Sequence, residues 1–402
     1  MKIIGQIPAI LLYSLISLST LTETIYSAAL PEITKQLNTD GGIAQLSTTA
    51  YYLGFALGIF TLGRISDIYG RRPIIIFGIS FYIFATFLIR RSGTIEIFIL
   101  CRFLQAYGAS VGSVIAQAMA RDSYKGRELS YIYASVSTLM SLVPSVGSAI
   151  GGYIIEYDKN WRNVFDFLIL LSSLMLIIYV KYLPETNPYI GRRENNRFLQ
   201  VLKTILKDKV LLSYALIIGF YNGICFGFYI QAPFIFIEKL CMSPSSYGRL
   251  FLILSVSNLC GGLITRFMIK KLVHTLKICI IGFTLSIIGC VLLLIGSFMI
   301  PFFEDGLIYS VLLIFIPTAI HLSGHAMLIP MLLRHALEDY TKVTGSAGSI
   351  FGTIYYFITA AVSFIISTFH SHKINNFAYL FSLLLLISIS VFYKSLNVKN
   401  IR

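Results

Sequence analysis

Long runs of apolar residues alternate with short polar segments along the whole chain. Each run approaches or exceeds the roughly 20 residues that a helix needs to cross the hydrocarbon core of a membrane. The first run is longer than the apolar part of a typical signal peptide, and eleven others follow it, so we expect it to be retained. The pattern predicts an all-α polytopic membrane protein with twelve spans, over residues 4–29, 43–63, 73–90, 95–119, 130–155, 163–183, 211–235, 245–268, 275–299, 306–332, 343–369 and 375–393.

The composition excludes the main alternatives to a membrane protein. Of the 402 residues, 56% are hydrophobic and 12% are charged, whereas a soluble domain has about 25% charged residues. So few charges cannot cover the surface of a soluble enzyme of this size, and so many apolar residues exclude a disordered chain. The six cysteines form no C-x-x-C pair, so neither a disulfide framework nor a zinc site is predicted.

The basic residues predict the orientation of the chain. The net charge is +14, which we attribute to Lys and Arg in cytoplasmic loops and not to nucleic-acid binding. With a cytoplasmic N-terminus, 23 of the 32 Lys and Arg fall in the termini and in the loops after even-numbered spans, and eight fall in the other loops. The remaining one, Arg102, lies within a span. We therefore expect both termini in the cytoplasm.

A long polar stretch divides the twelve predicted spans into six and six. A weak repeat at an offset of 199 accompanies this division, since Arg71 and Arg72 correspond to Lys270 and Lys271. Two halves with matching basic loops are typical of duplicated transporter folds. We predict an N-terminal half over 1–183, a cytoplasmic linker over 184–210 and a C-terminal half over 211–402.

The turn after the second span has properties that suit a gate. Residues 63–73 read GRISDIYGRRP. Gly63 permits a close approach of helices, and Gly70 permits a tight turn. Asp67 can face a helix N-terminus or an Arg, while Arg71 and Arg72 hold the loop in the cytoplasm. The segment resembles the loop 2–3 signature of the major facilitator superfamily, with Ile at position 68 where the family usually has Arg.

The fourth span contains a charged residue, Arg102, within RFLQAYGA. Such a charge is unfavourable in a membrane unless it has a partner or a water-filled cavity. Gln105 lies one helical turn away, so both side chains could face one cavity. The alternative is that Arg102 extends to the membrane interface. The segment is similar to the superfamily's span 4 signature, which implies that Arg102 takes part in proton coupling.

The fifth span carries Pro144, Gly147 and Gly151. The two glycines form a G-x-x-x-G pattern, which permits close helix crossing, and the proline bends the helix. The segment resembles the antiporter motif of drug-exporting members of the superfamily, with the proline before the first glycine. We expect these residues to act in gating.

Five further segments resemble the Bcr/CflA drug-resistance branch. They read ETIYSAALP at 23–31, NWR at 160–162 with LPET at 183–186, APF at 232–234 and SYGRLF at 246–251. The branch usually has an Asp at the position of Thr24, so Glu23 stands one place earlier. A carboxyl group within a span can exchange a proton. We predict that Glu23, together with Arg102, couples transport to protons.

Other polar and aromatic residues within the spans are candidates for a substrate cavity. His321 and His325 share a helix face and could bind a metal, but the H-E-x-x-H pattern is absent, so a polar stripe without metal is predicted. The candidate cavity residues are Tyr26, Gln105, Tyr221, Asn222, Gln231, Asn258, His321 and His325.

These observations predict a transporter and not an enzyme. No phosphate-binding G-x-x-x-x-G-K-[ST] motif exists, so the proton gradient is the expected energy source. The resemblance implies a monomeric proton-coupled antiporter in a bacterial inner membrane, which exports lipophilic drug-like molecules or small metabolites and needs no cofactor. Proton-coupled uptake of a nutrient and, more remotely, an intramembrane metalloenzyme are the alternatives.

Overall fold

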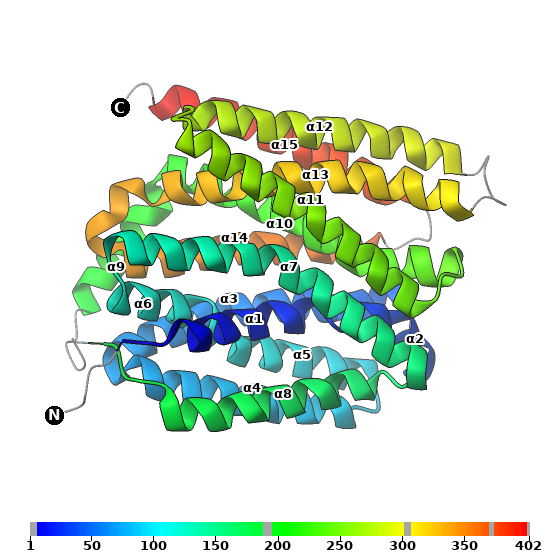
Figure 1. The fold of residues 1–402 in the computed structure, drawn as a ribbon, viewed down its shortest axis with the longest axis horizontal. Coiled ribbons are helices and arrows are strands. Elements are labelled where there is room, and N and C mark those ends of the chain that lie inside the picture. The colour runs from blue at the N-terminus through cyan, green and yellow to red at the C-terminus, as the bar shows by residue number, and fades with distance from the viewer. Residues whose placement is uncertain (1–5, 188–194, 301–306, 370–373, 400–402) are drawn as a thin grey trace.

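The computed structural model describes residues 6–187, 195–300, 307–369 and 374–399. Residues 188–194 of the predicted linker lie outside this range. Within the described residues, twelve helices are long and apolar enough to cross a membrane. This confirms the predicted all-α fold with twelve spans. The helices lie side by side in one bundle, and the first helix (Ala9–Thr24) begins at the same end of it at which the last helix (Ile374–Lys399) finishes (Figure 1).

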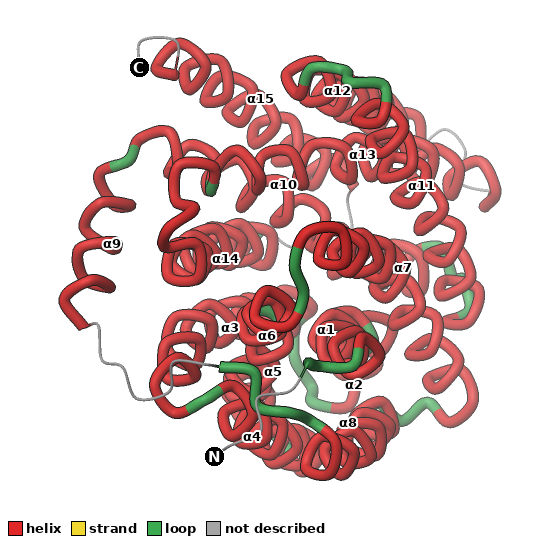
Figure 2. Tube along the Cα trace, turned by 60° about the vertical axis from the view of Figure 1, so that its left-hand side comes forward, coloured by secondary structure: helices red, strands yellow, loops and turns green. Residues whose placement is uncertain are grey.

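The first six spans pack together as one half of the bundle (Figure 2). Their helices are α1 (Ala9–Thr24), η1 (Ser27–Ala29), α2 (Leu30–Gln36), α3 (Gly41–Tyr69), α4 (Arg71–Arg91), α5 (Ile95–Ala109), η2 (Ser110–Gly112), α6 (Val114–Ser123), α7 (Gly126–Asp158) and α8 (Arg162–Tyr182).

The amphipathic helix α9 (Asn195–Lys207) follows and packs against the second half. That half contains the other six spans. Its helices are α10 (Lys209–Pro233), η3 (Phe234–Lys239), α11 (Pro244–Lys270), α12 (Thr275–Met299), α13 (Leu307–Ala336), η5 (Glu338–Val343), α14 (Thr344–Thr368) and α15 (Ile374–Lys399).

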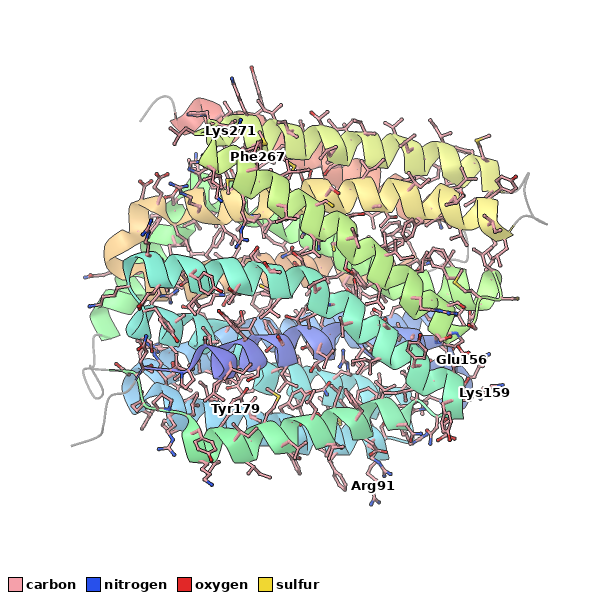
Figure 3. All side chains as sticks on the ribbon, viewed as in Figure 1. Arg91, Glu156, Lys159, Tyr179, Phe267 and Lys271 are labelled. Atoms are coloured by element: carbon pink, nitrogen blue, oxygen red, sulfur yellow. The ribbon has the colours of Figure 1, made fainter. Side chains whose placement is uncertain are left out.

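We call one end of the bundle the terminal end, because α1 begins there, α15 finishes there and the turn at Gly70 lies there. The opposite end carries the loops at Asn38 and Lys159. Figure 3 labels Lys271 at the terminal end and Glu156 and Lys159 at the opposite end.

Three spans are interrupted. The first changes from α-helix to a 3₁₀ turn at Ser27 before α2 begins, and the fourth does so at Ser110 before α6 begins. The seventh continues beyond Pro233 as a π-helix over Phe234–Lys239. Interruptions of this kind release backbone N–H and C=O groups from helical hydrogen bonds. They are found near the substrate-binding sites of transporters. The hydrophobic pattern did not reveal them: the predicted spans 4–29 and 211–235 end at the first and seventh breaks, and the predicted span 95–119 runs through the fourth.

Two helix pairs form the largest contacts between the halves, α3 with α14 and α7 with α11. Near the opposite end, a Cβ on Gly152 of α7 would lie 2.2 Å from the carbonyl oxygen of Pro244 on α11. A Cβ on Gly248 would lie 2.6 Å from Cα of Ala149. Only glycine allows the backbones to approach this closely. The contact between α7 and α11 is therefore backbone against backbone.

The apolar core of the N-terminal half is divided at the middle of the bundle. Phe98 and Cys101 of α5 belong to one buried cluster, and Ala106 and Ala109 of the same helix belong to another. Arg102 lies between them and is 0% exposed. This half therefore carries a polar layer across its centre.

Candidate functional site

Arg102 occupies the centre of that polar layer. Its Nη1 donates a hydrogen bond to Oε1 of Gln105 at 2.6 Å and approaches the carbonyl oxygen of Thr22 at 3.5 Å. The guanidinium carbon lies 3.9 Å and 4.5 Å from the ring centroids of Tyr26 and Tyr51. Its Nε and Nη2 have no hydrogen-bond partner among the described residues. Because Arg102 is completely buried, the alternative that it extends to the membrane interface is wrong.

Gln105 carries this network further into the N-terminal half. Its Nε2 donates to Oγ1 of Thr86 at 2.9 Å, and the hydroxyl groups of Thr22 and Tyr82 lie 2.8 Å apart. Gln105 is 0% exposed, and Tyr26 is 1% exposed with its hydroxyl bonded to that of Thr48. The structure thus places two of the predicted cavity residues inside one half, where they pack around Arg102.

Glu23 lies in the last turn of α1, at the surface where the two halves meet. It is half-buried, and its carboxyl group interacts with the hydroxyl group of Tyr52. Its Oε1 is buried without a hydrogen-bond partner among the described residues. The carboxyl group interacts electrostatically with Arg102 behind it, and with Cys225 and Tyr356 of the other half. Glu23 is therefore an acidic group that interacts with both halves.

Aromatic rings from both halves surround this position. The Tyr52 ring centroid lies 5.6 Å from that of Phe226 on α10 and 6.3 Å from that of Tyr356 on α14. Tyr356 lies 4.8 Å from Phe55 and 4.8 Å from Tyr355. We call these five residues the aromatic group. It joins the two halves around Glu23.

The predicted histidine pair lies within the C-terminal half. The Tyr221 ring centroid lies 5.6 Å from His321 and 6.3 Å from His325. His325 Nε2 lies 3.2 Å from Oδ1 of Asn222. His321 is 2% exposed, and neither of its ring nitrogens has a partner among the described residues. No group of three metal-ligating side chains occurs in the described part of the chain, so the two imidazoles lack the further ligands that zinc requires.

The two remaining cavity candidates lie on α10 and α11. Gln231 accepts a hydrogen bond at 2.8 Å from Nε2 of Gln45 on α3, close to the opposite end. This contact closes the gap between α10 and α3. Asn258 is half-buried on α11. The structure therefore brings together only part of the predicted set.

The turn at Gly70 is held by carboxylates. Gly70 has a φ of 104°, a backbone conformation that glycine adopts readily. Arg71 forms an ion pair with Asp67, and its Nε lies 3.3 Å from Oδ2 of Asp122. The two oxygens of Glu185 accept the backbone N–H groups of Arg71 and its successor at 3.0 Å and 3.1 Å. Glu185 thus caps the N-terminus of α4.

Arg72 and Gly63 complete this end. The guanidinium of Arg72 donates to the carbonyl oxygen of Val180 at 2.7 Å, which joins α4 to α8. A Cβ on Gly63 would lie 3.2 Å from Val114 of α6 and 3.9 Å from Ser349 of α14. Gly63 therefore lies where the second span meets both its own half and the other one.

The glycines of α7 pack on the break in the first span. A Cβ on Gly147 would lie 2.5 Å from Oγ1 of Thr24, and one on Gly151 would lie 1.8 Å from the carbonyl oxygen of Ile25. Pro144 lies inside the same helix, one turn before Gly147. The predicted gating motif thus contacts the residues that directly follow Glu23.

A family model described as Major Facilitator Superfamily matches residues 12–363. The chain belongs to this superfamily. An "Uncharacterized transporter" of Rickettsia bellii is 52% identical over 98% of this chain and 97% of its own length. "Multidrug resistance protein D" of Escherichia coli is 26% identical over 85% of this chain and 84% of its own length. A solved structure of the xylose transporter XylE from E. coli has a TM-score of 0.74 at 12% identity, with 96% of each chain covered.

Membership of the superfamily confirms that the protein is a multi-pass membrane transporter and not an enzyme. The metalloenzyme alternative is accordingly set aside.

Sequence reasoning missed Glu185 and Glu156. Glu185 stood in a segment that was read only as a family resemblance. Glu156 lies near the end of α7, where its Oε2 accepts the backbone N–H of Ser245 at 2.8 Å, across the two halves (Figure 3). An acid near a predicted helix end is too common to single out. Each acts on a helix N-terminus that is distant in sequence, so no local signal could have found it.

Proposed function

We propose that this superfamily member is a proton-coupled antiporter that exports small lipophilic molecules from the cytoplasm of a bacterium. It would act as a monomer in the inner membrane, with both termini in the cytoplasm. The position of Glu23 carries this proposal. Its carboxyl group lies at the middle of the bundle, between the halves, and one of its oxygens has no hydrogen-bond partner in the described part of the chain.

Such a carboxyl group can bind either a proton or a substrate. A proton neutralises it and removes the charge that holds the substrate. The proton then leaves when the site faces the cytoplasm, and the next substrate binds. Arg102 stabilises the charged carboxylate from behind, because opposite charges favour ionisation. Rocking of the two halves would present Glu23 to each side of the membrane in turn.

The contacts between the halves support this cycle. At the opposite end the halves are joined by the Glu156–Ser245 and Gln45–Gln231 hydrogen bonds. If the terminal end is cytoplasmic, as the basic residues predict, the structure represents a state closed to the outside. Export of a drug-like molecule is favoured over uptake by the similarity to Multidrug resistance protein D and by the glycines of α7.

Purified protein in proteoliposomes tests the proposal. An imposed proton gradient should drive accumulation of an exported compound in vesicles whose terminal end faces outward. Glu23→Gln should abolish this accumulation and leave protein insertion unchanged, because Gln cannot exchange a proton. Glu96→Gln, an exposed acid at the start of α5, serves as the matched control. Full activity of Glu23→Gln, or accumulation in the uptake direction only, would contradict the proposal.

A further inference from the structure

Corresponding glycines pack corresponding spans together in the two halves. In the N-terminal half, a Cβ on Gly108 of α5 would lie 2.7 Å from the carbonyl oxygen of Gly78 on α4. In the C-terminal half, a Cβ on Gly324 of α13 would lie 2.5 Å from the carbonyl oxygen of Gly282 on α12. Gly78 and Gly282 each stand seven residues after the first residue of their helix. The crossing of the third and fourth spans is thus repeated by the ninth and tenth.

Polar residues around Arg102 have counterparts at equal distances along the chain. Arg102 stands six residues before Gly108, and Thr318 stands six residues before Gly324. The side chain at this position is therefore short and uncharged in the C-terminal half. The other corresponding pairs, with the N-terminal residue first, are Tyr82 with Ser286, Gln105 with His321 and, at the offset of 199, Thr22 with Tyr221.

The two polar clusters differ in how their atoms are paired. Around Arg102, the side chains of the corresponding residues are hydrogen-bonded. In the C-terminal half, the hydroxyl oxygens of Tyr221 and Ser286 and both ring nitrogens of His321 are buried without a hydrogen-bond partner among the described residues. The two hydroxyl groups interact with each other, but not in hydrogen-bond geometry. Buried polar atoms without a partner are rare and unfavourable, and four of them in one cluster indicate a bound molecule.

A cavity lies beside His321. Its walls are the side chains of Thr318 and His321 together with apolar residues of α10, α12, α13 and α15. The volume open to the centre of a water molecule is about 10 Å³, which is sufficient for about one water. The described residues that line the cavity include no Asp, Glu, Lys or Arg, so an ion would have no oppositely charged partner there. The cavity therefore suits a neutral molecule of the size of water.

We propose that this cavity binds water, which is held by His321 and bridges to the hydroxyl groups of Tyr221 and Ser286. A neutral imidazole offers one donor and one acceptor, and each hydroxyl group can act as either, so water can satisfy these atoms. Water then takes, in the C-terminal half, the place that the guanidinium of Arg102 takes in the N-terminal half. The same polar layer is filled by a fixed charge in one half and by an exchangeable ligand in the other.

X-ray radiolysis of the purified full chain tests for the bound water. Hydroxyl radicals that form from a bound water oxidise the side chains beside it, even where those side chains are buried. Tyr221 should be oxidised several-fold faster than Tyr82, the matched control, which is equally buried and has its hydroxyl group bonded to that of Thr22. His321→Phe should remove this difference, because Phe offers water no hydrogen bond. Oxidation of Tyr221 that is no faster than that of Tyr82, or that is unchanged in His321→Phe, would overturn the proposal.

The sign of a stability change gives a second, independent test. If the cavity holds water, Ser286→Ala should lower the melting temperature by about 2 °C, because the bound water loses a partner. If the cavity is dry, the same variant should raise the melting temperature, because it removes a buried hydroxyl group that has no partner. Ser297→Ala on the same helix is the control, since that buried hydroxyl group donates to the carbonyl oxygen of Leu294. A melting temperature of Ser286→Ala above that of the unchanged protein would overturn the proposal, and this small substitution leaves the packing intact if His321→Phe fails to fold.

Discussion

Arg102 and Glu23 show how burial sets the role of a single side chain. Arg102 has one hydrogen bond to Gln105 and a long contact to Thr22, and two of its nitrogens find no partner among the residues that the structure describes. A buried cation with so few partners is costly, and the rings of Tyr26 and Tyr51 offset part of that cost. We infer that Arg102 is retained for its field on Glu23 and not for stability.

At this scale, Arg102→Lys should keep part of the proton-driven transport, whereas Arg102→Ala should lose it. Lys retains the charge but loses the planar fork that binds Gln105. Transport and thermal stability should be measured together, because Arg102→Ala also removes the donor to Gln105, at a cost of about 1–3 kcal/mol. Transport that is equal in the two variants would assign Arg102 a structural role only.

At the scale of helices, the glycines of α7 fix its distance from the first span. Gly151→Ala should abolish transport or folding, because the new Cβ would lie 1.8 Å from the carbonyl oxygen of Ile25. Gly262→Ala on α11 is the matched control, since a Cβ there meets no atom within 4 Å. Expression, detergent stability and transport of the two variants should be compared. A Gly151→Ala protein as stable and active as Gly262→Ala would contradict this packing.

The turn at Gly70 allows a second comparison of elements. Glu185→Gln should slow transport more than Asp67→Asn does, with little change in substrate affinity for either. Asp67 is 53% exposed and pairs with Arg71 at i,i+4, an arrangement worth about 0.3–0.5 kcal/mol. Glu185 is 7% exposed and accepts backbone N–H groups from both Arg71 and Arg72. The rate of transport and the equilibrium affinity for substrate should be measured for both variants. A larger loss of rate in Asp67→Asn than in Glu185→Gln would place the main gate contact at Asp67.

Hydrophobic periodicity predicted the helices better than it predicted their interruptions. Span number and approximate limits followed from apolar runs, since any such run must satisfy its backbone internally in lipid. The break after Thr24 and the π-helix after Pro233 depend on contacts with neighbouring helices, which the order of apolar residues does not reveal. The same holds for side chains, because the sequence marked Gln105 and Gln231 as polar but could not show which surface each would face.

At the scale of the whole molecule, closure of the opposite end depends on few polar contacts. Glu156→Ala should open this end more often, because it removes the acceptor for the N–H of Ser245. A net loss of about 0.5–1.5 kcal/mol would change the population several-fold. Asp158→Asn, which changes an exposed acid that bonds Asn163 at the same end, is the control.

Spin labels can measure this opening. In a Cys260→Ser background, labels on the exposed Cys241 and on Tyr157→Cys would report the separation of the two halves. Glu156→Ala should add a longer distance to the distribution, and Asp158→Asn should not. An unchanged distribution in Glu156→Ala would show that the backbone contacts alone hold this end closed.

The backbone contact between α7 and α11 also bears on how such a transporter diversifies. Gly152 and Gly248 place main chain against main chain. This contact between the halves therefore offers few side chains that single mutations could change in small steps. The aromatic group around Glu23 consists of side chains that can be exchanged one at a time. Selection for new substrates would therefore act on those rings, while the mechanics of the fold are inherited unchanged.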